Sequence, residues 1–375
     1  MAITEIPTPA ALVDTARMQR NIRVMQQRMN TLGVKLRPHV KTSKCVAVVQ
    51  QQINAGASGI TVSTLKEAEQ FFAAGIADIL YAVGMVPSKL AQAKALRDKG
   101  CDLKIIVDSL DAANAVVAFG RAHAHVFEVW AEIDTDGHRA GLKPDGDELI
   151  AVGRALHEGG MKLGGVMTHA GASYGLNTPE ALQAMAEQER SLCVHAAGRL
   201  RAAGLPCPTV SVGSTPTALS AQHLEGVSEV RAGVYVFHDL VMVNIGVAST
   251  DDVALSVLTT VIGHQKEKGW ALVDAGWMAM SRDRGTQQQS HDYGYGQVCD
   301  VDGCVLDGYT LSSANQEHGI LSRTGVIDND IASRFPVGTL LRILPNHACA
   351  TAAQYPQYVA ISGNEMQTWN RFYGW

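Results

Sequence analysis

Short apolar segments and helical segments alternate from about residue 35 to residue 236, and this alternation limits the folds open to the chain. The segments with the length and composition of strands lie at 35–41, 59–63, 78–83, 102–108, 126–134, 162–169, 208–213 and 228–236. Helical patterns separate them, at 64–74, 87–99, 110–122, 146–159 and 178–203. Strands that are apolar on both faces and alternate with helices predict a parallel sheet.

The number of strands favours a closed barrel over an open sheet. A further strand at 10–14 gives one candidate more than an eight-stranded barrel needs, and we assign it to a second domain. An open doubly wound sheet is the alternative, but it would carry a glycine-rich turn after its first strand, and residues 14–18 contain no glycine. The sequence therefore predicts an α/β protein with a (β/α)8 TIM barrel.

The pattern changes beyond residue 244, where turns rich in Gly, Asp and Asn separate strands without convincing helices. These strands lie at 253–263, 270–275, 297–301, 305–311 and 338–344. The pair Asp302-Gly303 is typical of a β-hairpin turn. We predict a barrel domain over 14–243 and an all-β domain formed by 1–13 and 244–375.

Composition narrows the class of protein. With 375 residues the chain is long enough for two domains, and its net charge of −5 argues against a nucleic-acid or anionic membrane surface. No apolar run could cross a bilayer, and the first residues lack the basic start of a signal peptide. The seven cysteines are scattered and form no CxxC pair, which favours reduced thiols. We expect a cytoplasmic enzyme with a small-molecule substrate and neither a nucleic-acid nor a membrane partner.

The segment 36–44 contains a lysine with chemical potential. Pro38 should interrupt the strand, and the alternation of side chains then places His39 and Lys41 on one face. A lysine that points inward from a strand end would be buried. Burial favours the neutral amine, which can attack a carbonyl to form a Schiff base. A solvated lysine at a strand end is the alternative.

Active sites of such barrels lie at the carboxyl ends of the strands. The polar and glycine residues there are His39, Lys41, Ser63, Thr64, Asp134, Arg139, Thr168, His169, Gly213, Ser214, Thr215, Gly233 and Tyr235. The run 213–215 leaves a strand and opens a helix, where N–H groups and hydroxyls can bind phosphate; a simple capped turn is the alternative. A phosphate site together with Lys41 suggests pyridoxal phosphate, with His169 flat against its ring.

A second motif lies near the carboxyl end of the chain. His347 and Cys349 stand two residues apart, on one face if the backbone is extended. Imidazole and thiolate are ligands that Zn²⁺ prefers, and two protein ligands would leave positions for water and substrate. A buried cysteine beside an unrelated histidine is the alternative.

These residues belong to runs of sequence that resemble a known family. The runs are Arg37-Pro38-His39-Val40-Lys41-Thr42, Thr168-His169-Ala170-Gly171, Gly213-Ser214-Thr215-Pro216-Thr217, Arg231-Ala232-Gly233-Val234-Tyr235-Val236-Phe237, Gln316-Glu317-His318-Gly319 and Pro345-Asn346-His347-Ala348-Cys349. In this order they resemble the D-serine dehydratase-like and D-threonine aldolase-like enzymes. These are fold-type III pyridoxal phosphate enzymes, similar to alanine racemase, and the resemblance covers nearly the whole chain.

The resemblance implies a role for each candidate. Lys41 would carry the cofactor and act as the base on the α-carbon of the substrate. His169 would flank the pyridine ring, and Tyr174 or Arg139 would contact its polar edge. The phosphate would be held by Gly213, Ser214, Thr215, Gly233 and Tyr235. His347 and Cys349 would bind Zn²⁺, with Mn²⁺ or Mg²⁺ as alternatives, and the chain would form a homodimer.

The implied function is a pyridoxal phosphate- and zinc-dependent dehydratase of β-hydroxy-D-amino acids. The expected substrate is D-threo-3-hydroxyaspartate, giving oxaloacetate and ammonia, with D-serine, giving pyruvate, as the second. Ser43 stands where the D-serine and D-threonine enzymes tend to carry histidine. An aldolase that releases glycine and an aldehyde, or a non-catalytic pyridoxal phosphate-binding protein, are the alternatives. The cations that could bind a substrate's side-chain carboxylate are Lys44, Arg139, Arg282 and Arg284.

Overall fold

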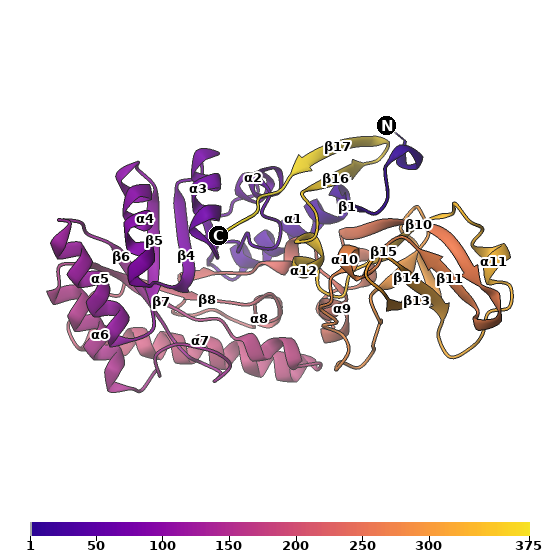
Figure 1. Ribbon diagram of the computed structural model, residues 1–375. Coiled ribbons are helices and arrows are strands. Elements are labelled where there is room, and N and C mark those ends of the chain that lie inside the picture. Colours follow the sequence, from indigo (N-terminus) through magenta and orange to yellow (C-terminus); the bar gives the residue numbers. More distant parts are fainter. Residues whose placement is uncertain (1) are drawn as a thin grey trace. The chain divides into compact units, whose positions relative to one another are not determined.

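The computed structural model describes residues 2–375, which form two compact units (Figure 1). The barrel unit contains residues 23–233 and 372–375, and the β unit contains the residues up to 22 together with 234–371. Each unit has its own sheet, eight-stranded in the first and nine-stranded in the second.

The unit boundaries differ from the predicted ones at 13/14 and 243/244. The first turns of helix α1 (Thr15–Thr31) belong to the β unit. Arg17 donates to the carbonyl of Val253 at 3.2 Å, and Asn21 donates to that of Asp252 at 2.8 Å. The last four residues belong instead to the barrel unit, where the N–H of Phe372 donates to the carbonyl of Lys44 at 2.8 Å. Hydrogen bonds between residues so far apart in the chain leave no pattern in the sequence that would mark a domain boundary.

The barrel unit is a parallel α/β barrel, as predicted. Its strands pair in the order β2-β9-β8-β7-β6-β5-β4-β3. They are β2 (Lys35–Leu36), β3 (Ile60–Val62), β4 (Asp78–Gly84), β5 (Asp102–Val107), β6 (Glu128–Glu132), β7 (Lys162–Met167), β8 (Thr209–Val212) and β9 (Glu229–Val230). Leu80, Ile106, Trp130 and Met167 form a buried cluster on four neighbouring strands. The near-continuous apolar segments of the sequence are therefore the buried strands of this barrel.

The residues after β2 close the barrel. Pro38 has no N–H, so the regular strand ends at Leu36. The carbonyl of Pro38 still accepts the N–H of Thr61 at 2.8 Å, and the N–H of Val40 donates to the carbonyl of Thr61 at 2.9 Å. On the other side, the N–H of His39 donates to the carbonyl of Ala232 at 2.8 Å. The segment thus joins β3 to the strand order that begins at β2.

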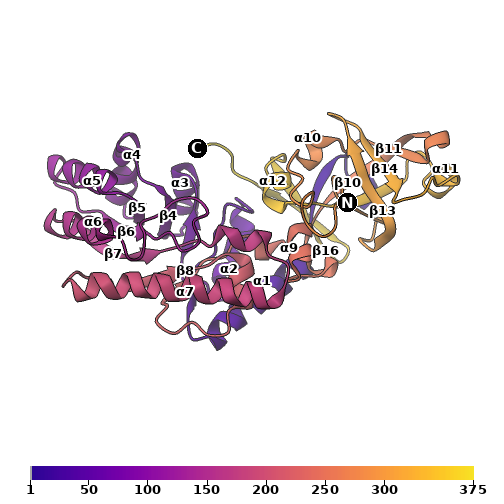
Figure 2. The ribbon, with the colours of Figure 1, turned by 90° about the horizontal axis from the view of Figure 1, so that it is seen from below.

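Helices connect the barrel strands (Figure 2). They are α2 (Val46–Asn54), α3 (Leu65–Ala73), α4 (Pro87–Asp98), α5 (Leu110–Ala122), α6 (Asp147–Glu158), α7 (Pro179–Ala202) and α8 (Thr215–Ser220), with the short 3-10 helix η2 (Gly171–Gly175) before α7. The side chains of Thr64, Ser109, Thr178 and Ser214 accept N–H groups at helix starts. These caps satisfy donors that have no partner within the helix and set where each helix begins.

The sheet of the β unit is antiparallel except where β1 meets β16. Its strands are β1 (Ala10–Asp14), β10 (Leu255–Gln265), β11 (Trp270–Val273), β12 (Gln297–Cys299), β13 (Val305–Ala314), β14 (Gly319–Arg323), β15 (Leu340–Leu344), β16 (Gln357–Ser362) and β17 (Glu365–Asn370). Because β10 pairs with both β15 and β11, the strands β10-β11-β14-β13-β12-β15 form a closed ring. Strand β1 (Ala10–Asp14) pairs with β10 and β16 in this sheet, whereas β14, β16 and β17 were not predicted.

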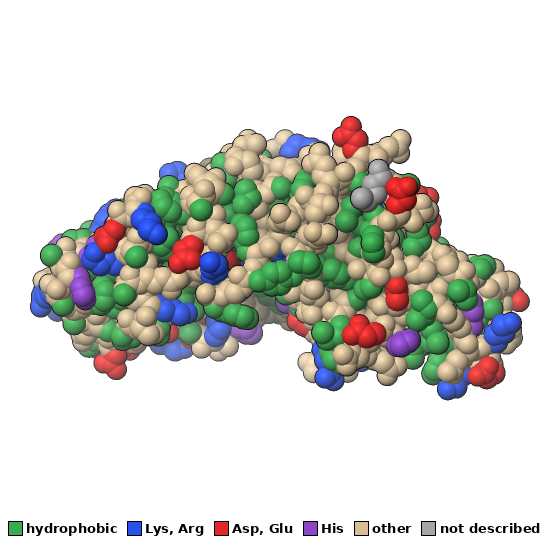
Figure 3. Space-filling model, turned by 45° about the horizontal axis from the view of Figure 1, so that its top comes forward, with side chains coloured by type: hydrophobic (Ala, Val, Ile, Leu, Met, Phe, Trp, Pro, Cys, Tyr) green, Lys and Arg blue, Asp and Glu red, His purple; other side chains and the backbone are tan. Residues whose placement is uncertain are grey.

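Short helices lie between these strands. They are η1 (Ile3–Glu5), η3 (Val234–Val236), α9 (Leu240–Ile245), η4 (Thr250–Asp252), η5 (Lys266–Lys268), α10 (Trp277–Met280), α11 (Ile331–Arg334) and α12 (Ala348–Ala352). On the face shown in Figure 3, acidic and basic side chains are interspersed. Among the described helices, none has both the length and the hydrophobicity that crossing a bilayer requires.

A buried ion pair ties the first barrel strand to its neighbours. Arg37, directly after β2, donates to Glu229 on β9 at 2.9 Å and to Asp78 on β4 at 2.7 Å. Burial lowers the pKa of Arg37, but the two carboxylates outweigh it and the net shift is upward. Lys104 adds a second cation at 2.5 Å from Asp78.

We predict that Arg37→Ala lowers the free energy of unfolding by about 3–5 kcal/mol, because Glu229 would remain buried without its counter-charge. Urea denaturation followed by circular dichroism measures the change. Lys94→Ala, which breaks the surface pair with Asp98, is the control and should cost less than about 1 kcal/mol. Equal losses in the two variants would contradict the role given to Arg37.

Candidate active site

Lys41 lies at the end of the barrel where the strands finish. The backbone before it is held from both sides, by the hydrogen bonds of His39 to Ala232 and of Val40 to Thr61. The lysine side chain itself is exposed, which agrees with the alternative of a solvated lysine at the strand end and not with a buried one. Its amine is therefore accessible to a ligand from solvent.

Four cationic or imidazole groups act electrostatically on His39. Burial lowers the pKa of His39 well below its usual value, and the nearby Lys41, Arg231, His169 and Arg139 lower it further. We call these five residues the barrel-mouth cluster. It is rich in positive charge and would favour an anionic ligand.

His169 is held as a neutral ring with a defined proton. Its Nδ1 lies 3.0 Å from the carbonyl oxygen of Gly213, and since a carbonyl only accepts, Nδ1 must donate. Burial lowers the pKa of His169 to about 4. The hydrogen bond to Gly213 raises this pKa in part, and the charges of Lys41, Arg231 and Arg139 lower it further. The Nε2 atom therefore carries no proton near neutral pH. The ring of Tyr174 lies 6.1 Å from that of His169, between centroids.

Arg139 pairs with a buried acid that the sequence argument did not identify. Its guanidinium lies 3.7 Å from Glu132 at the end of β6. Burial raises the pKa of Glu132, and Arg139 partly offsets this. Arg231, also without a predicted role, is buried and donates to Ser211 and to the carbonyl of Thr168. A charged residue inside an apolar strand pattern was the available signal for both.

The turn at Gly213 and Ser214 is a capped helix start. Gly213 has φ +132°, and a Cβ there would lie 2.3 Å from the carbonyl oxygen of Arg231, so only glycine fits. Its N–H donates to Glu189 and that of Ser214 donates to Thr217, both at 3.0 Å. These two N–H groups are thus engaged within the protein. Phosphate binding by Gly213, Ser214 and the buried Thr215 stays a prediction.

Gly233 and Tyr235, the remaining predicted phosphate residues, fall in different units. A Cβ on Gly233 would lie 3.0 Å from the carbonyl oxygen of His39 and 3.2 Å from the hydroxyl of Thr42, so a side chain would crowd the barrel mouth. Tyr235 lies in η3 of the β unit and is buried.

The β unit holds the predicted metal pair. His347 is the residue before α12 and Cys349 is the second residue of that helix, so the backbone is not extended across the whole pair. The two side chains are nevertheless hydrogen-bonded. Burial lowers the pKa of His347, but hydrogen bonds to Asp283 and Cys349 raise it to about 11.

Two aspartates hold this pair in place. Asp283 Oδ2 lies 2.6 Å from His347 Nδ1 and so fixes that edge of the imidazole ring. Asp239 is buried and accepts the N–H of Ala348 at 2.9 Å, between the two candidate ligands. Asp239 also caps α9 through the N–H of Met242. Within residues 2–375, no group of three or more His, Cys, Asp and Glu side chains is arranged to hold a metal.

Three of the four candidate cations for a substrate carboxylate are already paired. Lys44 lies 3.0 Å from Glu67, Arg284 lies 2.7 Å from Asp292, and Arg139 contacts Glu132. Arg282 stacks on the ring of Trp277 at 5.1 Å and, among the described residues, has no carboxylate partner.

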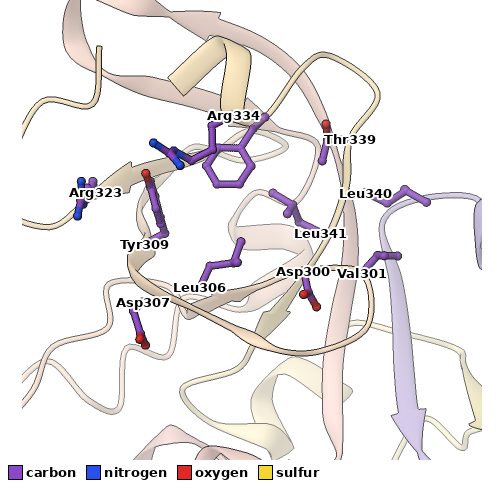
Figure 4. Close-up of a pocket in the computed structure, with 11 residues that line it drawn as sticks. Asp300, Val301, Leu306, Asp307, Tyr309, Arg323, Arg334, Thr339, Leu340 and Leu341 are labelled. Carbon is purple, nitrogen blue, oxygen red and sulfur yellow. The ribbon is translucent and has the colours of Figure 1, made fainter. Parts of the chain in front are cut away.

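A cavity of about 650 Å³ lies elsewhere in the β unit (Figure 4). Leu306 and Leu341 line its centre, and Arg323 and Arg334 lie near Tyr309 at one end. It contains none of the residues predicted for the site.

Comparisons with known proteins assign the family. Residues 13–240 match the model of the alanine racemase N-terminal domain, and residues 254–361 match that of the putative serine dehydratase domain. The protein belongs to the alanine racemase-like family. The predicted resemblance, including its dehydratase branch, is confirmed.

Three curated relatives within this family bear on the reaction. The chain is 68% identical to D-threo-3-hydroxyaspartate dehydratase of Delftia sp. (strain HT23), over 99% of this chain and 98% of the relative. It is 31% identical to D-serine dehydratase of Dictyostelium discoideum, over 99% and 97%. It is 27% identical to D-threonine aldolase of Arthrobacter sp., over 93% and 87%.

The solved structure of the Delftia dehydratase has the same fold. It superimposes with a TM-score of 0.99 at 67% identity, over the full length of both chains. Two variants of that enzyme, in which one histidine or one cysteine is replaced by alanine, have also been solved, and the cysteine variant is described as metal-free. The two replaced residues lie two positions apart, the spacing of His347 and Cys349.

We predict that Asp283→Ala weakens zinc binding by about 10–100-fold, because the carboxylate orients the imidazole of His347. Competition with a chromogenic chelator measures the affinity. Asp292→Ala, which removes the partner of Arg284, is the control and should leave the affinity unchanged. Cys349→Ala removes the proposed sulfur ligand, and this variant should bind zinc more weakly than Asp283→Ala and Asp292→Ala do. Unchanged affinity in Asp283→Ala would reject the orienting role.

Proposed function

We propose that this protein is a pyridoxal phosphate-dependent lyase that removes water from β-hydroxy-D-amino acids, with zinc as a second cofactor. The proposed substrate is D-threo-3-hydroxyaspartate, which yields oxaloacetate and ammonia, and D-serine, which yields pyruvate, is the second. The observation that carries the proposal is the 68% identity to the Delftia dehydratase over nearly the whole of both chains.

The barrel mouth fits pyridoxal phosphate. An aldehyde needs an accessible amine, and the side chain of Lys41 is exposed at the ends of the strands. A phosphate needs positive charge, and Lys41, Arg139 and Arg231 all act electrostatically on His39. Gly213 and Gly233 stand where a Cβ would meet neighbouring atoms at 2.3 and 3.0 Å. Lys41 would thus attach the cofactor, with Tyr174 or Arg139 at its polar edge.

The pair His347 and Cys349 fits zinc better than Mn²⁺ or Mg²⁺. The harder ions prefer oxygen ligands, whereas a thiol and an imidazole suit zinc. Asp283 on Nδ1 is the arrangement that usually orients a metal-bound histidine. Two protein donors would leave positions on the metal for a substrate oxygen.

The reaction needs a base for the α-proton, which is Lys41, and a Lewis acid for the β-hydroxyl, which is zinc. When bound, pyridoxal phosphate withdraws electrons from the substrate's α-carbon and zinc polarises its β-hydroxyl, since hydroxide alone is a poor leaving group. Lys41 Nζ takes the proton from the α-carbon on one face, which selects the D configuration. His169 stays neutral and holds its ring through Gly213. One water is lost in the elimination and one is consumed when the released enamine tautomerises and hydrolyses.

Arg282 is the proposed partner of a side-chain carboxylate. It is the one candidate cation without a carboxylate contact in the described part of the chain, and it precedes Asp283, which holds His347. A guanidinium can bind a carboxylate through two hydrogen bonds. This supports a dicarboxylate such as 3-hydroxyaspartate as the substrate.

The alternative functions have weaker support. Retro-aldol cleavage to glycine and an aldehyde would follow the Arthrobacter relative, but its identity is 27% against 68% for the dehydratase. A non-catalytic pyridoxal phosphate-binding protein has no need for residues 254–361, which match the serine dehydratase domain.

We also propose a cytoplasmic homodimer. No disulfide joins the cysteines in the described part of the chain, and most of them are buried, as expected for a reducing compartment. The dimer rests on the family resemblance, and sedimentation analysis tests it.

We predict that Lys41→Ala loses the absorption band of the bound cofactor, since no amine would remain at that position to attach it. Activity should fall at least about 10²–10⁴-fold with the base removed. Borohydride reduction of the loaded wild-type protein followed by peptide mass analysis should place the label on Lys41. Lys44→Ala is the control and should still be labelled there. A label on any other lysine of the wild-type protein would overturn the assignment.

A further inference from the structure

A buried acid on helix α7 links the two loops that carry the candidate cofactor residues. Helix α7 packs against β7 and β8 (Figure 1), and Glu189 on this helix is only 2% exposed. One carboxylate oxygen, Oε1, accepts two backbone N–H groups, from Ala170 at 2.9 Å and from Gly213 at 3.0 Å. Ala170 follows His169 after β7, and Gly213 precedes Ser214 after β8.

The position of Glu189 is fixed on its other side as well. Thr217 in α8 donates a side-chain hydrogen bond to the carboxylate, and the same hydroxyl accepts the N–H of Ser214. Arg231 of the barrel-mouth cluster adds a favourable charge. Burial by itself raises the pKa of Glu189, so this acid is retained against a desolvation cost.

Polar contacts also join the two loops directly. His169 Nδ1 donates to the carbonyl of Gly213, and Ser173 lies 2.9 Å from Ser214 between hydroxyl oxygens. Without Glu189, the N–H groups of Ala170 and Gly213 would be buried donors lacking an acceptor. Each would then favour a loop conformation in which it reaches water or another partner.

We propose that Glu189 is a positioning residue for pyridoxal phosphate, which holds the His169 loop and the Gly213–Ser214 turn in the conformation that binds the cofactor. The inference rests on the proposed function, because the ligand is the cofactor proposed there. Glu189 acts through geometry, since a single oxygen must reach both N–H groups. Its negative charge, close to a site for a dianion, is not what the site requires.

The test separates geometry from charge. Glu189→Gln keeps an oxygen at the same reach and loses the charge, whereas Glu189→Asp keeps the charge and withdraws the oxygen by one methylene group. Pyridoxal phosphate is titrated into each cofactor-free protein and its dissociation constant is measured from the absorption band. We expect Glu189→Gln to stay within about threefold of wild type and Glu189→Asp to bind about 10–100-fold more weakly. Glu189→Ala should match or exceed the loss in Glu189→Asp.

A control distinguishes positioning from general stability. Glu128→Ala removes another poorly exposed glutamate of the barrel, at the start of β6, which accepts from Trp130 at 3.1 Å and pairs with Lys162 at the start of β7. It should lower the thermal midpoint and leave the cofactor dissociation constant within about twofold of wild type. The proposal is overturned if Glu189→Asp binds like wild type, if Glu189→Gln is as impaired as Glu189→Asp, or if Glu128→Ala weakens the cofactor equally. Failure of the wild-type protein itself to bind pyridoxal phosphate would instead reject the proposed function.

Discussion

The hydrogen bonds made by residues 38–40 close the barrel, and the candidate chemistry depends on that closure. Pro38 ends the regular strand, yet its carbonyl and the N–H of Val40 both bond to Thr61, while His39 bonds to Ala232. The backbone is therefore fixed from two sides immediately before Lys41. The fold therefore fixes the position from which the Lys41 side chain extends, while the amine at its end stays accessible. Arg37, which directly precedes this segment, forms ion pairs with Glu229 and Asp78 and holds it in place.

Buried charge is concentrated around this closure. Arg37, Arg231, Glu189 and Glu229 all have little exposed surface, and each bonds to a group from another barrel element. Such groups are costly to desolvate and are tolerated only when their hydrogen bonds are satisfied. In this barrel they fix the ends of β2, β7, β8 and β9, which carry His39, His169, Gly213 and Gly233. Burial, together with the positive charges of Lys41, Arg231 and Arg139, lowers the pKa of His39 and His169 and keeps both rings neutral.

The sequence predicts the barrel well because its strands are buried on both faces and read as continuous apolar runs. The strand β17 (Glu365–Asn370) escaped prediction since it is a largely exposed edge strand with polar residues, and such strands lack an apolar pattern. His347 and Cys349 were identified from their types, but their geometry was not, because the start of α12 depends on Asp239, more than a hundred residues away. Glu189 could not be found at all from sequence. A glutamate within a long helix gives no sign that its oxygen meets two distant N–H groups.

The central claim is that a β-hydroxy-D-amino acid loses water and not its Cα–Cβ bond. The most direct measurement is product analysis with the purified protein, pyridoxal phosphate, zinc and D-threo-3-hydroxyaspartate, with ammonia, oxaloacetate and glycine quantified together. The account predicts ammonia and oxaloacetate in equal amounts and no glycine. Glycine with glyoxylate, the products of cleavage between the α- and β-carbons, would contradict it and place the protein with the aldolases.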